Sequence, residues 1–212
     1  MSRAPSLPSH FSTVEQRSVA NHLGLWTFLA TEILFFGGLF VCYTVYRIAY
    51  PAAFVAGSHH LNFWIGTINT GVLLTSSLFM ALADRAVKRD RRTALRWCLL
   101  ATWLLGAVFL GLKFYEYGEK YHEHLIPGPN FQLNGPWKPQ IELFIFLYFT
   151  MTGLHAVHMI GGLTALAWLL WQNHRGRLSP EHPAPVEMVG LYWHFVDCVW
   201  VFLYPLLYLI IR

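Results

Sequence analysis

The chain has 212 residues, of which 55% are hydrophobic and 12% are charged, and its mean hydropathy is +0.41. Soluble domains carry about 25% charged residues, so this composition excludes an ordinary soluble enzyme and predicts an integral membrane protein. The formal net charge is +4, but the basic residues lie in short segments between apolar runs, which argues against a nucleic-acid partner.

Five apolar segments are long enough to cross a bilayer, because a helix of about 20 residues spans a hydrocarbon core roughly 30 Å thick. They are residues 23–49, 63–83, 95–115, 141–171 and 188–211. We predict an all-α integral membrane bundle of five transmembrane helices, forming one domain over residues 22–212. The proline- and serine-rich residues 1–21 are predicted to be a loosely ordered cytoplasmic segment.

The connections between these helices are predicted to be irregular. Pro51 should end the first helix, so that residues 51–62 form a short loop. The third helix should end in the charged and tyrosine-rich stretch GLKFYEYGEK at the membrane interface. The longest connection, residues 118–140, is rich in proline and glycine and is predicted to be a loop.

Basic residues are distributed unevenly over the connections. If the N-terminus is inside, the inner segments hold 10 of the 15 Lys and Arg residues. The positive-inside rule therefore predicts a cytoplasmic N-terminus and a periplasmic C-terminus. The residues expected at the membrane surface, against anionic lipid headgroups, are Arg85, Lys88, Arg89, Arg91, Arg92, Arg175 and Arg177.

The cysteines and histidines do not form a recognisable metal motif. Cys42, Cys98 and Cys198 occur singly in three predicted helices, which argues against a disulfide framework or a thiolate metal centre. A haem held by His155 and His194 would need both residues at one depth on facing helices. No further haem motif accompanies them, so we predict that this chain binds no metal or cofactor itself.

Five ionisable residues fall at membrane depth: Glu32, His155, His158, His194 and Asp197. A charged group at a helix centre costs at least about 2.5–3.5 kcal/mol, so such residues normally face protein or water and have a partner. These positions are therefore the candidate buried site, with a role in either proton handling or helix packing.

Depth along the helices suggests which of these residues can meet. We expect Glu32 to be buried inside the bundle and hydrogen-bonded to a histidine of the fourth helix, with His155 as the first choice. His155 and His158 are three residues apart and should share one helix face. His194 and Asp197 have the same spacing and can pair within their helix or with a neighbour.

Several stretches together point to one family. LATEILFFGGLF, INTGVLLTSS, GLKFYEY, TGLHAVHMIGG and YWHFVDCVWVFLY follow one another along the chain. In this order they resemble the blocks of subunit III of haem-copper respiratory oxidases, the cytochrome c oxidase subunit III family, from about residue 23 to the C-terminus. Glu32, His155, His158, His194 and Asp197 fall on the family's motif positions, and Glu187 also matches a family acid.

The resemblance implies a supporting role in an enzyme complex. It implies that the haems and copper lie in partner subunits, that the chain packs on subunit I, and that it supports proton uptake, lipid retention and stability during turnover. It further implies subunit II and a small subunit as partners, cytochrome c as the electron donor, bound structural phospholipid and the bacterial inner membrane as the location.

Other functions remain compatible with these residues. Mitochondrial-type subunits III resemble this chain but carry two additional N-terminal helices, so a lipid cleft walled by those helices is not implied here. Subunit III of a quinol oxidase, or an accessory subunit of a nitric oxide reductase, would share the same motifs. A stand-alone small transporter that uses Glu32 as a proton carrier is an alternative from another class.

Overall fold

The computed structural model describes residues 14–128, 131, 137–181 and 183–210, and these residues form helices and connections but no strand. The helices are α1 (Val14–Ala49), α2 (Pro51–Ser58), α3 (Phe63–Lys88), α4 (Arg92–His122), α5 (Lys138–His174) and α6 (Ala184–Tyr208). All except α2 are long and apolar enough to cross a membrane. The predicted all-α bundle with five membrane helices is confirmed.

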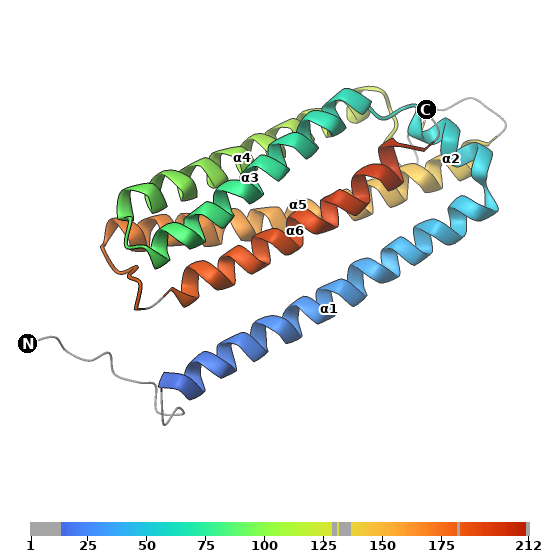
Figure 1. Cartoon of the computed structure of the whole chain (residues 1–212). Coiled ribbons are helices and arrows are strands. Elements are labelled where there is room, and N and C mark those ends of the chain that lie inside the picture. Colours follow the sequence, from blue (N-terminus) through green and yellow to red (C-terminus); the bar gives the residue numbers. More distant parts are fainter. Residues whose placement is uncertain (1–13, 129–130, 132–136, 182, 211–212) are drawn as a thin grey trace, which may run out of the picture.

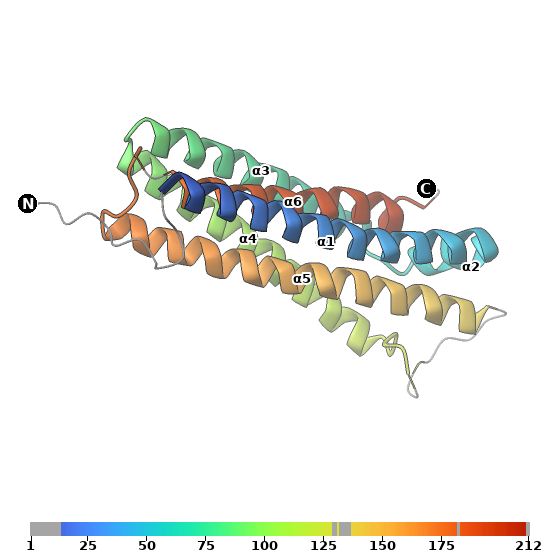
Figure 2. The same cartoon turned by 90° about the horizontal axis from the view of Figure 1, so that it is seen from below.

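Helices α3 to α6 form a packed group, and α1 lies along one side of it (Figures 1 and 2). Within the group α3 packs on α4 and α6, and α5 packs on the same two helices, whereas α1 contacts α5 and α6 only sparsely. Only 11% of the most apolar stretch of α1 is buried, compared with 28–50% for the other four spans. Most of α1 is therefore available to lipid or to another protein.

The two ends of the bundle differ in charge. The turns α3–α4 and α5–α6 lie at the end where α1 begins, and α2 and the end of α6 lie at the opposite end (Figure 1). We call these the basic end and the far end. The basic end carries the exposed residues Arg85, Lys88, Arg89, Arg91, Arg92, Arg175 and Arg177.

Two predicted boundaries differ from the structure. Helix α1 begins at Val14, inside the segment 1–21 that was expected to be loosely ordered; residues 1–13 lie outside the described part. Residues 51–58 form α2 rather than a loop, because proline at a first helical position starts a helix as readily as it ends the one before. Phe54 of α2 packs edge-to-face on Phe144 of α5, with ring centroids 5.3 Å apart.

The fully buried Trp193 of α6 brings the long helices close together in the core. A Cβ atom at Gly106 of α4 or Gly162 of α5 would lie 2.6 Å or 2.8 Å from the Trp193 ring. Because only glycine leaves room at these positions, the indole fits between α4 and α5. Its Nε1–H donates to the Ser76 hydroxyl of α3 at 3.1 Å, so one side chain contacts three other helices.

Candidate functional site

Glu32 of α1 meets a histidine of α5, as expected, but the histidine is His158. Glu32 Oε2 lies 3.0 Å from His158 Nε2. The other ring nitrogen, Nδ1, lies 2.8 Å from the Leu154 carbonyl oxygen, which can only accept, so Nδ1 carries a hydrogen. Nε2 and the carboxyl can then hydrogen-bond only with a proton between them, on either the acid or the imidazole. The pair therefore holds one exchangeable proton.

This pair lies at the edge of the bundle. The side chains of Glu32 and His158 are 18% and 15% exposed, so the expectation that Glu32 is buried inside the bundle is wrong. Phe36 packs edge-to-face on the His158 ring, and Tyr192 donates to the His158 carbonyl oxygen at 2.9 Å. The contacts fix the orientation of the histidine while the carboxyl stays close to the surface.

The expected partner, His155, has a different environment. Its side chain is 1% exposed and packs against the rings of Phe109 and Trp200, inside the α3–α6 group. Three residues along an α-helix change the side-chain direction by about 60°. Because α5 contacts both α1 and the core helices α4 and α6, that rotation directs His158 toward α1 and His155 toward the core. The prediction of His155 as the partner of Glu32 is wrong.

His194 and Asp197 lie in the interface between α3 and α6. His194 Nδ1 is 2.6 Å from the Ser77 hydroxyl of α3, so this histidine bonds a neighbouring helix rather than Asp197. The Asp197 side chain is 4% exposed, and neither of its carboxyl oxygens has a hydrogen bond of ordinary geometry from the described residues. The Ser77 hydroxyl lies beside it.

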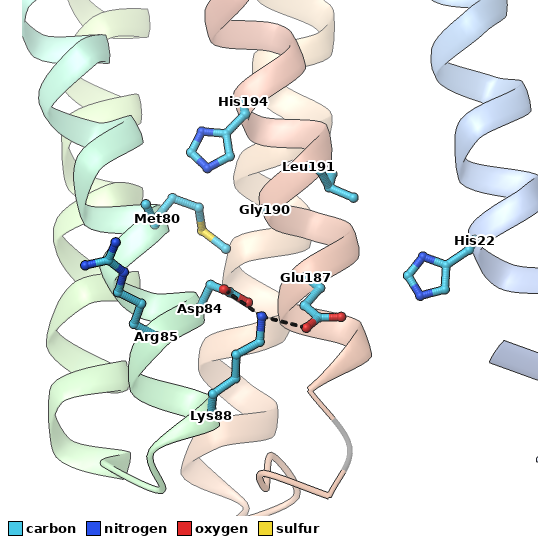
Figure 3. Close-up of a pocket in the computed structure, with 10 residues that line it drawn as sticks. His22, Met80, Asp84, Arg85, Lys88, Glu187, Gly190, Leu191 and His194 are labelled. Atoms are coloured by element: carbon cyan, nitrogen blue, oxygen red, sulfur yellow. Dashed lines mark hydrogen bonds and ion pairs between the residues drawn. The ribbon is translucent and has the colours of Figure 1, made fainter. Parts of the chain in front are cut away.

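Glu187 lies at the basic end, in the wall of a cavity of about 380 Å³ that six ionisable side chains help to line and that we call the polar cavity (Figure 3). Lys88 Nζ is 2.8 Å from Glu187 Oε1 and 2.9 Å from Asp84 Oδ2, so one lysine joins a carboxylate of α6 to a carboxylate of α3. His22 of α1 faces them across the cavity, and His194 lies at its inner end (Figure 3). Lys88 was expected only as a headgroup contact and also bridges two helices.

Two other basic-end residues are held by an aromatic ring. The guanidinium carbons of Arg175 and Arg177 lie 4.4 Å and 5.5 Å from the centre of the Trp171 ring. Cation–π contacts of this kind hold arginine at a surface without removing its charge. The arrangement leaves both guanidinium groups exposed at the end of α5.

Sequence reasoning missed a buried ionic cluster near the far end. Lys113 Nζ lies 2.8 Å from Glu116 Oε2 and donates to the Tyr208 hydroxyl at 2.6 Å; that hydroxyl is 2.8 Å from Glu116 Oε1. The side chains of Lys113 and Glu116 are 3% and 0% exposed, and Lys113 Nζ is 4.7 Å from the centre of the Trp200 ring. Lys113 and Glu116 therefore face the interior of the bundle, and the interface position of the stretch GLKFYEYGEK stays a prediction. The i,i+3 spacing of Lys113 and Glu116 was the available signal.

An apolar groove of about 570 Å³ separates α1 from α6. It is lined by Trp26, Leu29, Ile33, Phe36, Gly37, Phe40, Leu191, His194, Phe195, Cys198, Val199 and Phe202. Leu191 and His194 also line the polar cavity, so the two spaces adjoin at these side chains. Within the described part of the chain, no three His, Cys, Asp or Glu side chains are placed to hold a metal ion.

Known proteins share much of this sequence. Residues 133–211 match the profile of the family described as cytochrome c oxidase subunit III. The cytochrome c oxidase subunit 3 of Thermostichus vulcanus is 34% identical over 191 residues, which cover 90% of this chain and 87% of the relative. The chain belongs to the cytochrome c oxidase subunit III family.

Other members of the family show a range of complexes. A probable quinol oxidase subunit 3 of Staphylococcus saprophyticus is 29% identical over 94% of each chain. A haem-copper oxidase subunit I+III of Aeropyrum pernix is 31% identical over 88% of this chain and 22% of the longer relative. The resemblance found in the motif blocks is confirmed, and the family contains a protein whose name joins subunits I and III.

Proposed function

We propose that this chain is the non-redox accessory subunit III of a bacterial haem-copper terminal oxidase in the inner membrane. The observation that carries the proposal is the similarity to a cytochrome c oxidase subunit 3 over 90% of the chain. In this proposal the complex reduces oxygen with electrons from cytochrome c, and the haems and copper lie in partner subunits. Subunit I is the main contact, which the fused relative supports, and subunit II and a small subunit are further partners.

The proposed orientation places the basic end in the cytoplasm and the C-terminus in the periplasm. Seven exposed Lys and Arg residues at one end, defined above, support this orientation because cytoplasmic connections are enriched in them. There they would contact anionic headgroups. The apolar groove beside α1 would hold the tail of a structural phospholipid, since a groove open to the hydrocarbon region and lined by apolar side chains favours an acyl chain over water.

We propose that the Glu32–His158 pair supports proton supply to subunit I. The pair holds one proton and both side chains are partly exposed on the sparsely covered side of α1, where a partner subunit or water can reach them. The pair therefore combines an exchangeable proton with access.

The subunit assignment is tested by purifying the native complex through a tag on this chain. We expect a haem-containing subunit I to co-purify and the complex to oxidise cytochrome c with consumption of oxygen. Oxidation of quinol instead would show that the complex is a quinol oxidase, as the name of the Staphylococcus relative suggests for that protein. Turnover of nitric oxide would show that the complex is a nitric oxide reductase. Proton-coupled transport by the reconstituted chain alone, without haem protein, would overturn the assignment.

The role of the carboxyl is tested by Glu32→Gln. We expect normal assembly, haem content and initial activity, because the glutamine amide can still donate to Nε2 of His158. Activity should then be lost over fewer turnovers than in the wild type, because the amide cannot exchange a proton at this position. The measurement is oxygen consumption over successive additions of substrate.

A matched control is available one residue away. Thr31 is exposed on the same helix and its hydroxyl bonds the Phe28 carbonyl of its own helix, so Thr31→Ala should leave endurance unchanged. If Glu32→Gln matches this control, the pair serves packing only. Failure of Glu32→Gln to assemble would show that the charged or protonated acid is needed for folding and would contradict the proton-supply role.

A further inference from the structure

Polar side chains line one path from the basic end into the membrane interior, between α3 and α6. Asp84 and Glu187 lie at the mouth, and His194 and Ser77 lie deeper. Asp197 follows three residues after His194. Along α6 the step from Glu187 to Asp197 is ten residues, or roughly 15 Å at 1.5 Å per residue.

The first part of the path is the polar cavity at the basic end. Its volume of about 380 Å³ exceeds the roughly 30 Å³ that one water occupies in the liquid. Lys88 joins the two carboxylates at its mouth, and the His194 ring forms its inner end (Figure 3). A proton that enters from the basic end can therefore reach an imidazole about two helical turns inside the bundle.

The second part of the path is a hydrogen-bonded pair that can pass a proton on. The Nδ1 atom of His194 lies 2.6 Å from the Ser77 hydroxyl. An imidazole can gain a proton at one nitrogen and release one from the other, and a hydroxyl both accepts and donates. The Ser77 hydroxyl also lies beside the Asp197 carboxyl, whose oxygens form no hydrogen bond of ordinary geometry with the described residues, so His194 and Ser77 lie between the cavity and the acid.

The path ends at an acid that has no ionic partner. Asp197 is 4% exposed and forms no ion pair with a described Lys or Arg residue. The polar groups that face it or its relay are Ser77 and Asp84 on α3, His194 and Glu187 on α6, and His22 on α1 at the mouth. An unpaired carboxylate is costly in such surroundings, so the acid is tolerated there in its protonated form.

We propose that the polar cavity is a proton entrance and that Asp197 is a buried proton-binding site loaded through His194 and Ser77. A proton from the cavity binds His194 Nε2, the hydrogen on Nδ1 moves to the Ser77 oxygen, and the original Ser77 hydrogen moves to the Asp197 carboxylate. The reverse sequence empties the site, so no oxidant or reductant is needed. This proposal deepens the proton-supply part of the proposed function and adds a second site, distinct from the Glu32–His158 pair.

The test follows the proton of Asp197 in the intact complex by infrared spectroscopy. The C=O stretching band of a protonated carboxyl shifts when the complex is moved into D₂O, and the band is assigned by its loss in Asp197→Asn. We expect rapid exchange in the wild type. In Ser77→Ala the exchange should slow by about 10²-fold, since positioned proton-transfer groups contribute about 10²–10⁴-fold to such steps.

Thr75→Ala is the matched control. The Thr75 hydroxyl is two residues away on α3 and, among the described residues, donates to the Gly71 carbonyl of its own helix, so exchange should stay at the wild-type rate. His194→Phe provides a second variant that interrupts the relay at the cavity. Because Ser77→Ala removes a single oxygen, it keeps the proposal testable even if the larger change at His194 prevents assembly.

Two results would overturn the proposal. Absence of any protonated-carboxyl band assigned to Asp197 would show that the acid is not a proton-binding site. Equal exchange rates in Ser77→Ala, Thr75→Ala and the wild type would show that protons reach the acid by another path. Either result would leave the co-purification with a haem-containing subunit I unaffected, so it would reject the proton path and not the subunit assignment.

Discussion

Replacing Lys113 with methionine is expected to lower the free energy of unfolding by about 3–5 kcal/mol, the cost of removing one partner of a buried ion pair. The change leaves the Glu116 carboxylate, whose side chain is 0% exposed, without its counter-charge. It also removes the ammonium group from the Tyr208 hydroxyl, and so weakens the attachment of the end of α6 to α4. The measurement is an SDS titration of the purified complex, with unfolding of this chain followed by protease sensitivity.

Two further variants identify the cause of the loss. Lys113→Met combined with Glu116→Gln should recover most of the stability, because no unpaired charge remains and the amide can still bond Tyr208. Lys120→Met should cost only about 0–1 kcal/mol, since its partner Glu123 is 51% exposed and stays hydrated. If the double variant is as unstable as Lys113→Met alone, the lysine acts through packing rather than charge.

Gly162→Ala is expected to destabilise the chain by about 1–3 kcal/mol, the usual cost of overpacking a filled core. The new methyl group would lie 2.8 Å from two carbons of the Trp193 ring, which is fully buried and also touches α4 at Gly106. The indole cannot move away without losing its hydrogen bond to Ser76. The same SDS titration measures the effect.

Gly153→Ala is the matched control on the same helix. No atom lies within 4 Å of a Cβ built at Gly153, so this variant gains the helix propensity of alanine, up to about 1 kcal/mol, without a steric conflict. The difference between the two variants isolates the contact with Trp193. Equal stabilities would show that the core around this indole can relax, and would contradict the packing argument.

The proposed roles depend on different parts of the molecule. The pair Glu32–His158 joins α1 to α5 on the sparsely covered side of the bundle, whereas Asp197 lies between α3 and α6. The ion pair of Lys113 with Glu116 and the hydrogen bond of Lys113 to Tyr208 join α4 to α6 near the far end. Variants at these three places should therefore affect turnover endurance, proton exchange and stability separately, as expected for sites that share no side chain.

The site itself was only partly predictable. The hydropathy pattern placed Glu32 and the histidines of α5 at comparable depth, because depth depends on position along a helix. It could not show which histidine faces α1, since the rotation of α5 about its axis depends on what packs against each face. Lys113 and Glu116 show a related limit. Their i,i+3 spacing indicates that they can pair, but a pair near the end of an apolar span can face headgroups or the core, and only the packing of the helices decides which.

The sequence by itself determined the membrane class, the five spans and the family. The length of an apolar run and the order of the motif blocks can both be read from short stretches of sequence, without knowing how the helices pack. Only the tertiary structure decided that His158 rather than His155 meets Glu32, that α2 forms within a predicted loop, and that Lys88 joins Asp84 to Glu187. Each of these depends on the rotation and spacing of neighbouring helices, which are set by contacts such as that of Trp193 with Gly106 and Gly162 between residues far apart in the chain.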